Sequence, residues 1–316
     1  MKTLFSVLFT FLLIPLQGQR LVKDMSPGIG HMPVSFKGSL KNGFIFVCYS
    51  QYGYEPWISD GTNSGTKIIK DINPGQAGSV GSDFFYFNDT IMYFAGQVAN
   101  ENFLWRTDGT ANGTFKIFKF EQSLPSAYYN EGVMAGKYFY FSDPKASNTL
   151  WRTDGSVAGT EKIYAFKDSG LSSKISLNYH NGTLYIFAAD KLHGTELWIS
   201  DGTEAGTRLL KDISPGQRGS IISNRTKMIP LKNKLYFGAS GSNEEGNELY
   251  ETDGTEEGTV LFGDFETQKY SSSRPVLFAG NDSFFLFNTQ GNIDKAWKSD
   301  GTLINTKGLI DTNSYS

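Results

Sequence analysis

The side chains that most often carry catalysis or bind metals are few in this sequence. Its 316 residues include one cysteine, Cys48, and three histidines, His31, His180 and His193. The histidines share no metal-ligand spacing, and no HExxH, GxSxG, P-loop or GxGxxG motif occurs in a fitting context. Cys48 lies within an apolar run and is expected to be a small core residue rather than a nucleophile. We therefore predict no catalytic, cofactor-binding or metal-binding residue.

Carboxylates are more numerous, but six aspartates recur in one repeated turn. The turn residues are Asp60, Gly61, Thr62; Asp108, Gly109, Thr110; Asp154, Gly155; Asp201, Gly202, Thr203; Asp253, Gly254, Thr255; and Asp300, Gly301, Thr302. An aspartate in such a turn accepts hydrogen bonds from the backbone two residues on, and the glycine tolerates a left-handed conformation. Each turn offers one reliable carboxylate, whereas Ca²⁺ takes about 6–8 oxygen ligands. We expect structural turns that satisfy their own polar groups.

These turns belong to an internal repeat that covers most of the chain. The central aspartates are spaced by 48, 46, 47, 52 and 47 residues. All five tryptophans lie three residues before such an aspartate, and a tyrosine fills the sixth place: Trp57, Trp105, Trp151, Trp198, Tyr250 and Trp297. A repeat of about 47 residues is typical of propeller blades. We expect these aromatic residues to pack between blades.

Each repeat reads as four short strands. In the second repeat we expect strands at 84–87, 90–95, 103–107 and 115–120, with a variable loop over 96–102. The turns between first and second strands are rich in Asn, Asp and Gly, such as Asn181-Gly182 in the fourth repeat. The neighbours Leu197 and Trp198 must point to opposite faces of a strand, so both faces are buried, as in a blade between two other blades. The sequence predicts an all-β, six-bladed β-propeller of four-stranded antiparallel blades, folded as one domain over residues 19–316 and monomeric.

The fourth strand has seven copies rather than six. Residues 21–24 open the mature chain with a copy that resembles residues 69–71 and 210–212, and residues 309–311 end it with another. One terminal copy is expected to complete the last blade and close the ring, which would remove an exposed sheet edge. The sequence does not decide which copy takes this place.

The N-terminus and the composition indicate export. Lys2 precedes an apolar run from Leu4 to Leu16, and Gly18 is a small residue at a fitting cleavage point, so residues 1–18 are predicted to be a signal peptide. A single cysteine excludes an intrachain disulfide. The net charge of −3, with scattered basic residues, favours neither nucleic acid nor an anionic membrane. No later segment is apolar enough to span a membrane.

The repeat resembles the ELWxxDGT family of bacterial surface and secreted proteins. Residues 196–198 and 201–203 match the motif fully, the other five repeats match in part, and the resemblance covers nearly all of the mature chain. It implies propeller-like β structure at the cell surface or in the extracellular space and no assigned enzymatic chemistry. The chain stops at Ser316 without the C-terminal sorting domain that such proteins often carry, so a periplasmic location is the alternative. The turn is also similar to the Asp-box of sialidases, which is structural.

Two classes of function remain. The first is a non-catalytic protein that binds an extracellular glycan, peptide or protein. The second is a sialidase-like hydrolase, which would need an arginine cluster; Arg106 and Arg152, however, hold equivalent repeat positions near the rim. Loops on a rigid scaffold are the usual binding sites, and the variable loops join the second and third strands. The longest runs from Ser240 to Asn247; its candidate binding residues are Ser240, Asn243, Glu244 and Glu245.

Overall fold

The computed structural model describes residues 21–25, 35–79, 86–121, 132–143, 149–166, 175–217, 219–221, 227–241, 247–265, 276–290 and 293–310. The predicted signal peptide lies outside this part, as do His31, Asn243, Glu244 and Glu245. In the described ranges no helix has the length and hydropathy that a membrane span requires. Their helical content is the single 3-10 turn η1 (Leu303–Asn305).

Six sheets of four antiparallel strands follow one another along the chain, and strand order within each sheet is sequential. Blades 1 to 3 contain β1 (Ser35–Leu40), β2 (Gly43–Ser50), β3 (Gly53–Ser59), β4 (Lys67–Ile68); β5 (Tyr86–Phe87), β6 (Met92–Val98), β7 (Glu101–Thr107), β8 (Phe115–Lys119); β9 (Gly132–Ala135), β10 (Tyr138–Ser142), β11 (Thr149–Thr153) and β12 (Glu161–Ala165). Blades 4 to 6 contain β13 (Ser176–His180), β14 (Thr183–Asp190), β15 (Gly194–Ser200), β16 (Arg208–Lys211); β17 (Ile229–Leu231), β18 (Lys234–Ser240), β19 (Asn247–Thr252), β20 (Val260–Gly263); β21 (Val276–Ala279), β22 (Phe284–Gln290), β23 (Ile293–Ser299) and β24 (Lys307–Ile310). The predicted all-β, six-bladed architecture is confirmed.

The predicted hairpin turns have a clear backbone basis. Between β13 and β14 the turn residues Asn181 and Gly182 have φ angles of 48° and 85°, the left-handed pair that a tight hairpin needs. Between β6 and β7 the turn is Ala99 and Asn100, with φ angles of 51° and 65°. Pairing of Val98 with Glu101 continues the strands to this turn, so the loop expected over 96–102 is mostly strand.

A β-bulge that the sequence did not reveal recurs in the fourth strand. In blade 2, Leu104 pairs with Phe118 and Trp105 with Lys116, so Ile117 is the extra residue of β8. The same shift occurs in blades 3 to 6. A bulge bends its strand and re-aims the extra side chain. In blades 2 to 5 that side chain is buried in the core: Ile117, Ile163, Leu210 and Phe262.

The hydrophobic core lies between blades. Five aromatic residues of the repeat each share a cluster with a residue that lies shortly after the fourth strand of the preceding blade. The pairs are Trp105 with Ile72, Trp151 with Phe120, Trp198 with Phe166, Tyr250 with Ile213 and Trp297 with Phe265. Trp57 shares its cluster with Met25 of the N-terminal segment. The buried surfaces of neighbouring blades therefore hold one another in place.

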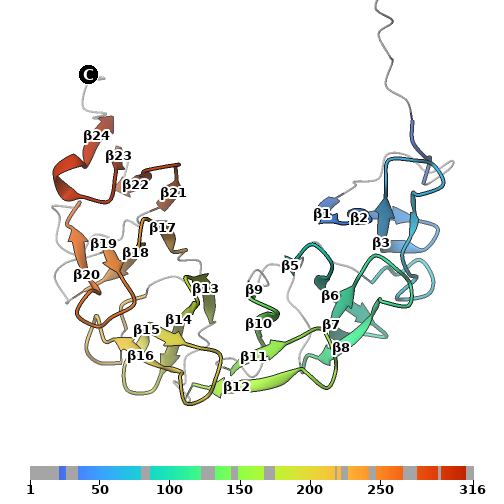
Figure 1. Ribbon diagram of the computed structural model, residues 1–316, viewed down its shortest axis with the longest axis horizontal. Coiled ribbons are helices and arrows are strands. Elements are labelled where there is room, and N and C mark those ends of the chain that lie inside the picture. Colours follow the sequence, from blue (N-terminus) through green and yellow to red (C-terminus); the bar gives the residue numbers. More distant parts are fainter. Residues whose placement is uncertain are drawn as a thin grey trace, which may run out of the picture.

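The blades are arranged in an arc, with their first strands toward the inside and their fourth strands toward the outside (Figure 1). Figure 1 also shows an opening between blade 1 and blade 6. The expectation that six blades close the ring is therefore not met in this structure. The copy of the fourth strand at the C-terminus is β24, and it pairs with β23 as the last strand of blade 6.

Candidate binding face

The two ends of the blades form two different faces. We call the end that carries the first-to-second-strand turns and the Asp-Gly-Thr turns the turn face. On it, the Lys41 amide donates to the Asp89 carbonyl (3.0 Å), and Asn42 Nδ2 donates to the Asp108 carbonyl (3.1 Å). We call the opposite end, with the second-to-third-strand turns and the links between blades, the loop face. Both faces are candidates for ligand contacts.

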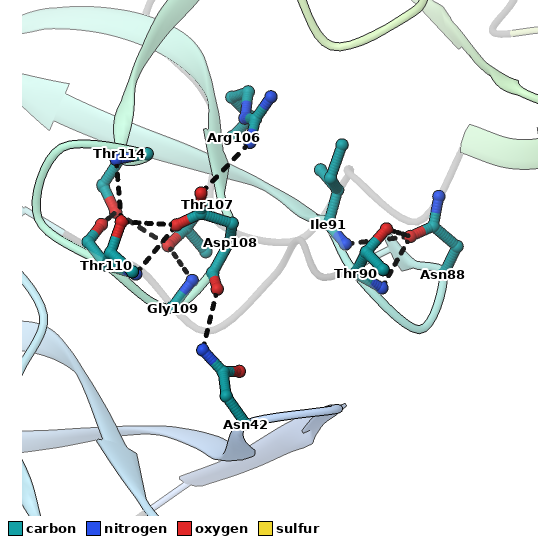
Figure 2. A network of polar contacts seen from close by, with 11 residues as sticks. Asn42, Asn88, Thr90, Ile91, Arg106, Thr107, Asp108, Gly109, Thr110 and Thr114 are labelled. Atoms are coloured by element: carbon teal, nitrogen blue, oxygen red, sulfur yellow. Dashed lines mark hydrogen bonds and ion pairs between the residues drawn. The ribbon is translucent and has the colours of Figure 1, made fainter.

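The Asp-Gly-Thr turns satisfy their own polar groups, as expected (Figure 2). Asp108 Oδ1 accepts hydrogen bonds from the Thr110 amide (2.9 Å) and hydroxyl (2.7 Å). The Thr110 hydroxyl in turn accepts from the Gly113 amide (3.0 Å), and the Thr107 hydroxyl accepts from the Gly109 amide (3.0 Å). The same carboxylate contacts recur at Asp60, Asp154, Asp201, Asp253 and Asp300. These carboxylates act as caps of their own turns.

The charge of a turn aspartate is stabilised by these bonds. The hydroxyl and amide of Thr203 donate to Asp201 and hold the pKa of its carboxyl below the ordinary value. Within the described ranges, no group of three or more His, Cys, Asp and Glu side chains has a geometry that could hold a metal ion. The turn face therefore presents repeated, internally bonded polar loops.

The arginines that a sialidase-like site would need are used between and within blades. Arg152 donates to Glu161 through Nε (2.8 Å) and Nη2 (2.7 Å). Its Nη1 donates to the Gly202 carbonyl in the next blade (2.8 Å). Arg106 Nη2 lies 3.6 Å from Asp108 Oδ2 in the same blade. Arg152 thus joins two blades, Arg106 pairs within its own blade, and the two side chains do not converge on one ligand position.

Cys48 and His193 have defined surroundings. Cys48 is buried, and this burial raises the pKa of its thiol to about 11, which keeps the thiolate scarce at neutral pH.

His193 Nδ1 lies 2.9 Å from Asp190 Oδ2. Asp190 Oδ1 also accepts from the Leu192 amide (3.0 Å) and the His193 amide (2.7 Å). This carboxylate therefore fixes the shape of the turn between β14 and β15.

A buried glutamate is a structural residue that the sequence reasoning missed. Glu196 Oε1 accepts from the Ser214 amide (3.0 Å), and Oε2 accepts from the Ile213 amide (3.2 Å) and the Ser220 hydroxyl (2.5 Å). Glu55 makes the same three contacts in blade 1. The signal was the glutamate that opens the Glu-Leu-Trp motif.

Burial dominates the titration of these glutamates. The surrounding apolar groups desolvate Glu196 and raise its pKa to about 7, against the lowering effect of its three hydrogen bonds. Glu55 is raised to about 7 for the same reason. Because both side chains bond the link to the next blade, they hold that link at the loop face.

The loop face displays exposed side chains on backbone segments that hydrogen bonds hold in place. Leu192, at the tip of the β14–β15 turn, is 70% exposed, while Asp190 bonds the turn beneath it. The links expose Pro74 to Ala77 and Pro215 to Gln217. Ser240 ends β18 next to the longest variable loop, and its amide donates to the Ser220 carbonyl (2.8 Å). The arrangement offers apolar and polar groups with little backbone freedom to lose on binding.

No protein family model matches the sequence, and no curated protein matches it. Solved structures do resemble the chain. A prolyl endopeptidase matches with a TM-score of 0.54 and 12% identity, over 89% of this chain and 44% of its own. Oligopeptidase B from Leishmania major matches with a TM-score of 0.52 and 10% identity, over 90% of this chain and 42% of its own. These are likenesses to propeller domains, and they show the fold alone. The chain spans less than half the length of either structure.

Proposed function

We propose that this chain is an exported, non-catalytic binding protein that engages an extracellular glycan, peptide or protein through its loop face. The observation that carries the proposal is the β14–β15 turn, where a buried carboxylate holds the backbone that presents an exposed leucine. A preordered apolar tip loses little conformational entropy when a partner covers it. The turn face, by contrast, repeats one self-bonded turn six times.

A sialidase-like hydrolase is the weaker alternative. Such an enzyme needs arginines aimed at a substrate carboxylate, yet Arg152 is bonded to Glu161 and to the next blade. The likeness to peptidase structures leaves an enzyme open, since these matches concern the propeller fold and less than half of each chain. The fold hosts many unrelated functions. The binding role rests on the chemistry of the loop face.

The proposal is tested by probing an array of extracellular glycans and peptides with the full chain. Leu192→Ser is compared with Val157→Ser, because Val157 is similarly exposed (63%) but lies on the turn face. We expect Leu192→Ser to weaken retention of the wild-type ligands at least tenfold, with Val157→Ser unchanged. The reverse pattern, in two folded variants, would place binding on the turn face. Retention of no probe by wild type would overturn the proposed binding role.

A further inference from the structure

One contact recurs at each junction between consecutive blades. The glycine of an Asp-Gly-Thr turn lies against a side chain of the preceding blade. At four junctions a Cβ built on this glycine would meet a tyrosine hydroxyl; the pairs are Gly155 with Tyr93, Gly202 with Tyr140, Gly254 with Tyr185 and Gly301 with Tyr236. At the fifth junction a Cβ built on Gly109 would meet Ile58 and Asn42. Gly61, in blade 1, has the same φ angle as Gly202 (90°), but a Cβ there would have nothing within 4 Å. Within the described part of the chain, the turn of blade 1 therefore lacks the neighbour that the other five have.

The free face of blade 6 carries the missing half of this contact. Phe285 pairs with Lys298 across β22 and β23, which is the position that Tyr236 holds opposite Glu251 in blade 5. Phe285 is only half-buried, and Val276, Phe278 and Phe287 are exposed on the same blade. The rings of Phe278 and Phe287 also contact each other, and contiguous exposed apolar side chains mark an interaction surface.

Blade 1 is exposed in the complementary way. Phe44 pairs with Ser59 in β2 and β3 and is 40% exposed. The five residues at its repeat position are at most 2% exposed: Met92, Phe139, Leu184, Leu235 and Phe284. Met92 shows the reason, since it packs with Ile45 and Ile58 of the preceding blade. Blade 1 and blade 6 each present a face shaped for a neighbouring blade.

The N-terminal segment, residues 21–25, is not part of a β-strand in this structure, but it makes the contacts that a fourth strand makes with the next blade. Lys23 Nζ donates to the Thr66 carbonyl of blade 1 (2.6 Å). Lys70, two residues after β4 of blade 1, donates to the Thr114 carbonyl of blade 2 in the same way (2.7 Å). Met25 packs on the Trp57 cluster as Ile72 packs on the Trp105 cluster. Residues 21–25 thus hold the place of a strand that belongs to a blade before blade 1.

Two copies of the fourth-strand segment therefore flank the opening: residues 21–25 and β24. Each of them lacks one of the two blades that such a segment contacts elsewhere in the chain. Val22 lies beside blade 1 but has no blade of its own, and it is 40% exposed. Leu309 belongs to blade 6 but has no following blade, and it is 50% exposed. The five residues at their repeat position are at most 6% exposed: Ile69, Ile117, Ile163, Leu210 and Phe262. If blade 6 contacted blade 1 directly, residues 21–24 and β24 would have to occupy the same position. This conflict arises whether the two blades belong to one chain or to two copies.

We propose that the opening between blade 6 and blade 1 binds one further blade, supplied as a three-stranded antiparallel β unit and completed by residues 21–24 as its fourth strand. This occupant completes both flanking strands without displacing either. Its second strand would place an aromatic side chain against Gly61, and a glycine turn after its third strand would receive Phe285. The partner is thus a polypeptide segment that carries this repeat, and the inference stands independently of the ligand on the loop face.

The first test uses the full chain alone. Gly61→Ala and Gly202→Ala carry the same backbone strain, but Gly202→Ala also drives a Cβ into the hydroxyl of Tyr140. We expect a monomer by light scattering and a melting temperature that falls by roughly 2–4 °C with Gly61→Ala and by at least twice that with Gly202→Ala. Equal falls in melting temperature for the two variants would show that Gly61 already has a neighbouring blade, so that the chain closes on itself. A dimer or filament would show that a second copy is the occupant. Either result overturns the proposal.

The second test supplies the blade. A copy of residues 166–207, which contain the link before β13, the strands β13 to β15 and the following Asp201-Gly202-Thr203 turn, is joined after Ser316. We expect a higher melting temperature and weaker binding of a hydrophobic dye. In the extended chain, Gly61→Ala should lower the melting temperature as much as Gly202→Ala does. Val22→Asp should cancel these gains in the extended chain and change the original chain little. An extension that leaves the melting temperature, dye binding and the Gly61→Ala effect unchanged would refute the added blade.

Discussion

Truncation of Trp198 tests whether the tryptophan series is the core between blades. The indole is 6% exposed and contacts the ring of Phe166 from the preceding blade, with centroids 5.0 Å apart at 81°. Tyr164 lies on the same side at 6.1 Å. Replacing Trp198 by alanine removes this contact and opens a cavity at a junction that both blades share.

The size of the loss follows from the buried area. A tryptophan buries about 150–250 Å², which at about 25 cal/mol per Å² corresponds to roughly 4–6 kcal/mol of transfer free energy. Alanine retains part of this, and partial collapse of the site recovers more, so the free energy of unfolding should fall by about 3–5 kcal/mol. The Trp198 Nε1 atom has no hydrogen-bond partner among the residues that the structure describes. Trp198→Phe should therefore cost clearly less, below about 2 kcal/mol.

The measurement is urea unfolding followed by far-ultraviolet circular dichroism, which does not depend on the removed fluorophore. Val157→Ala serves as the control, because that side chain is exposed on the turn face. A loss below about 1 kcal/mol for Trp198→Ala would refute the assignment of this residue to the core. Equal losses for the alanine and phenylalanine variants would show that the indole N–H has a partner.

Three further predictions concern charge and loops. Burial raises the pKa of Glu196 above the ordinary value of 4.5 to about 7, so its contribution to stability is present below pH 4.5 and is lost as the pH rises through 7. Glu196→Gln should flatten the fall of the melting temperature between pH 5 and pH 8, and an unchanged slope would contradict the raised pKa. Because the turn carboxylates cap their own loops, EDTA should leave the melting temperature unchanged; a drop that Ca²⁺ restores would show a bound ion. Replacing residues 240–247 by a short Gly-Ser turn should abolish ligand retention in a folded protein, whereas a conservative change of Asn181 on the turn face should not; the opposite result would place the partner on the turn face.

The sequence alone determined the features that depend on local periodicity. The phase of the aspartates and tryptophans predicted six units of four strands, because a turn and a strand pattern need only nearby residues to be recognised. The turn at Asn181 and Gly182 was predicted for the same reason, and its backbone angles agree. The self-bonded aspartate turns also follow from local chemistry, since each carboxylate bonds groups two residues on.

The tertiary structure decided what depends on contacts between distant residues. Ile117 is a bulge residue only because of its register against β7, and Glu196 is a buried anchor only because the following link folds back onto it. The sequence also offered two terminal fourth strands without an order of preference. The structure seats both, one on blade 1 and one on blade 6, and leaves the ring open between them. Whether a strand completes its own blade or its neighbour's is set by packing across the ring, which no local pattern contains.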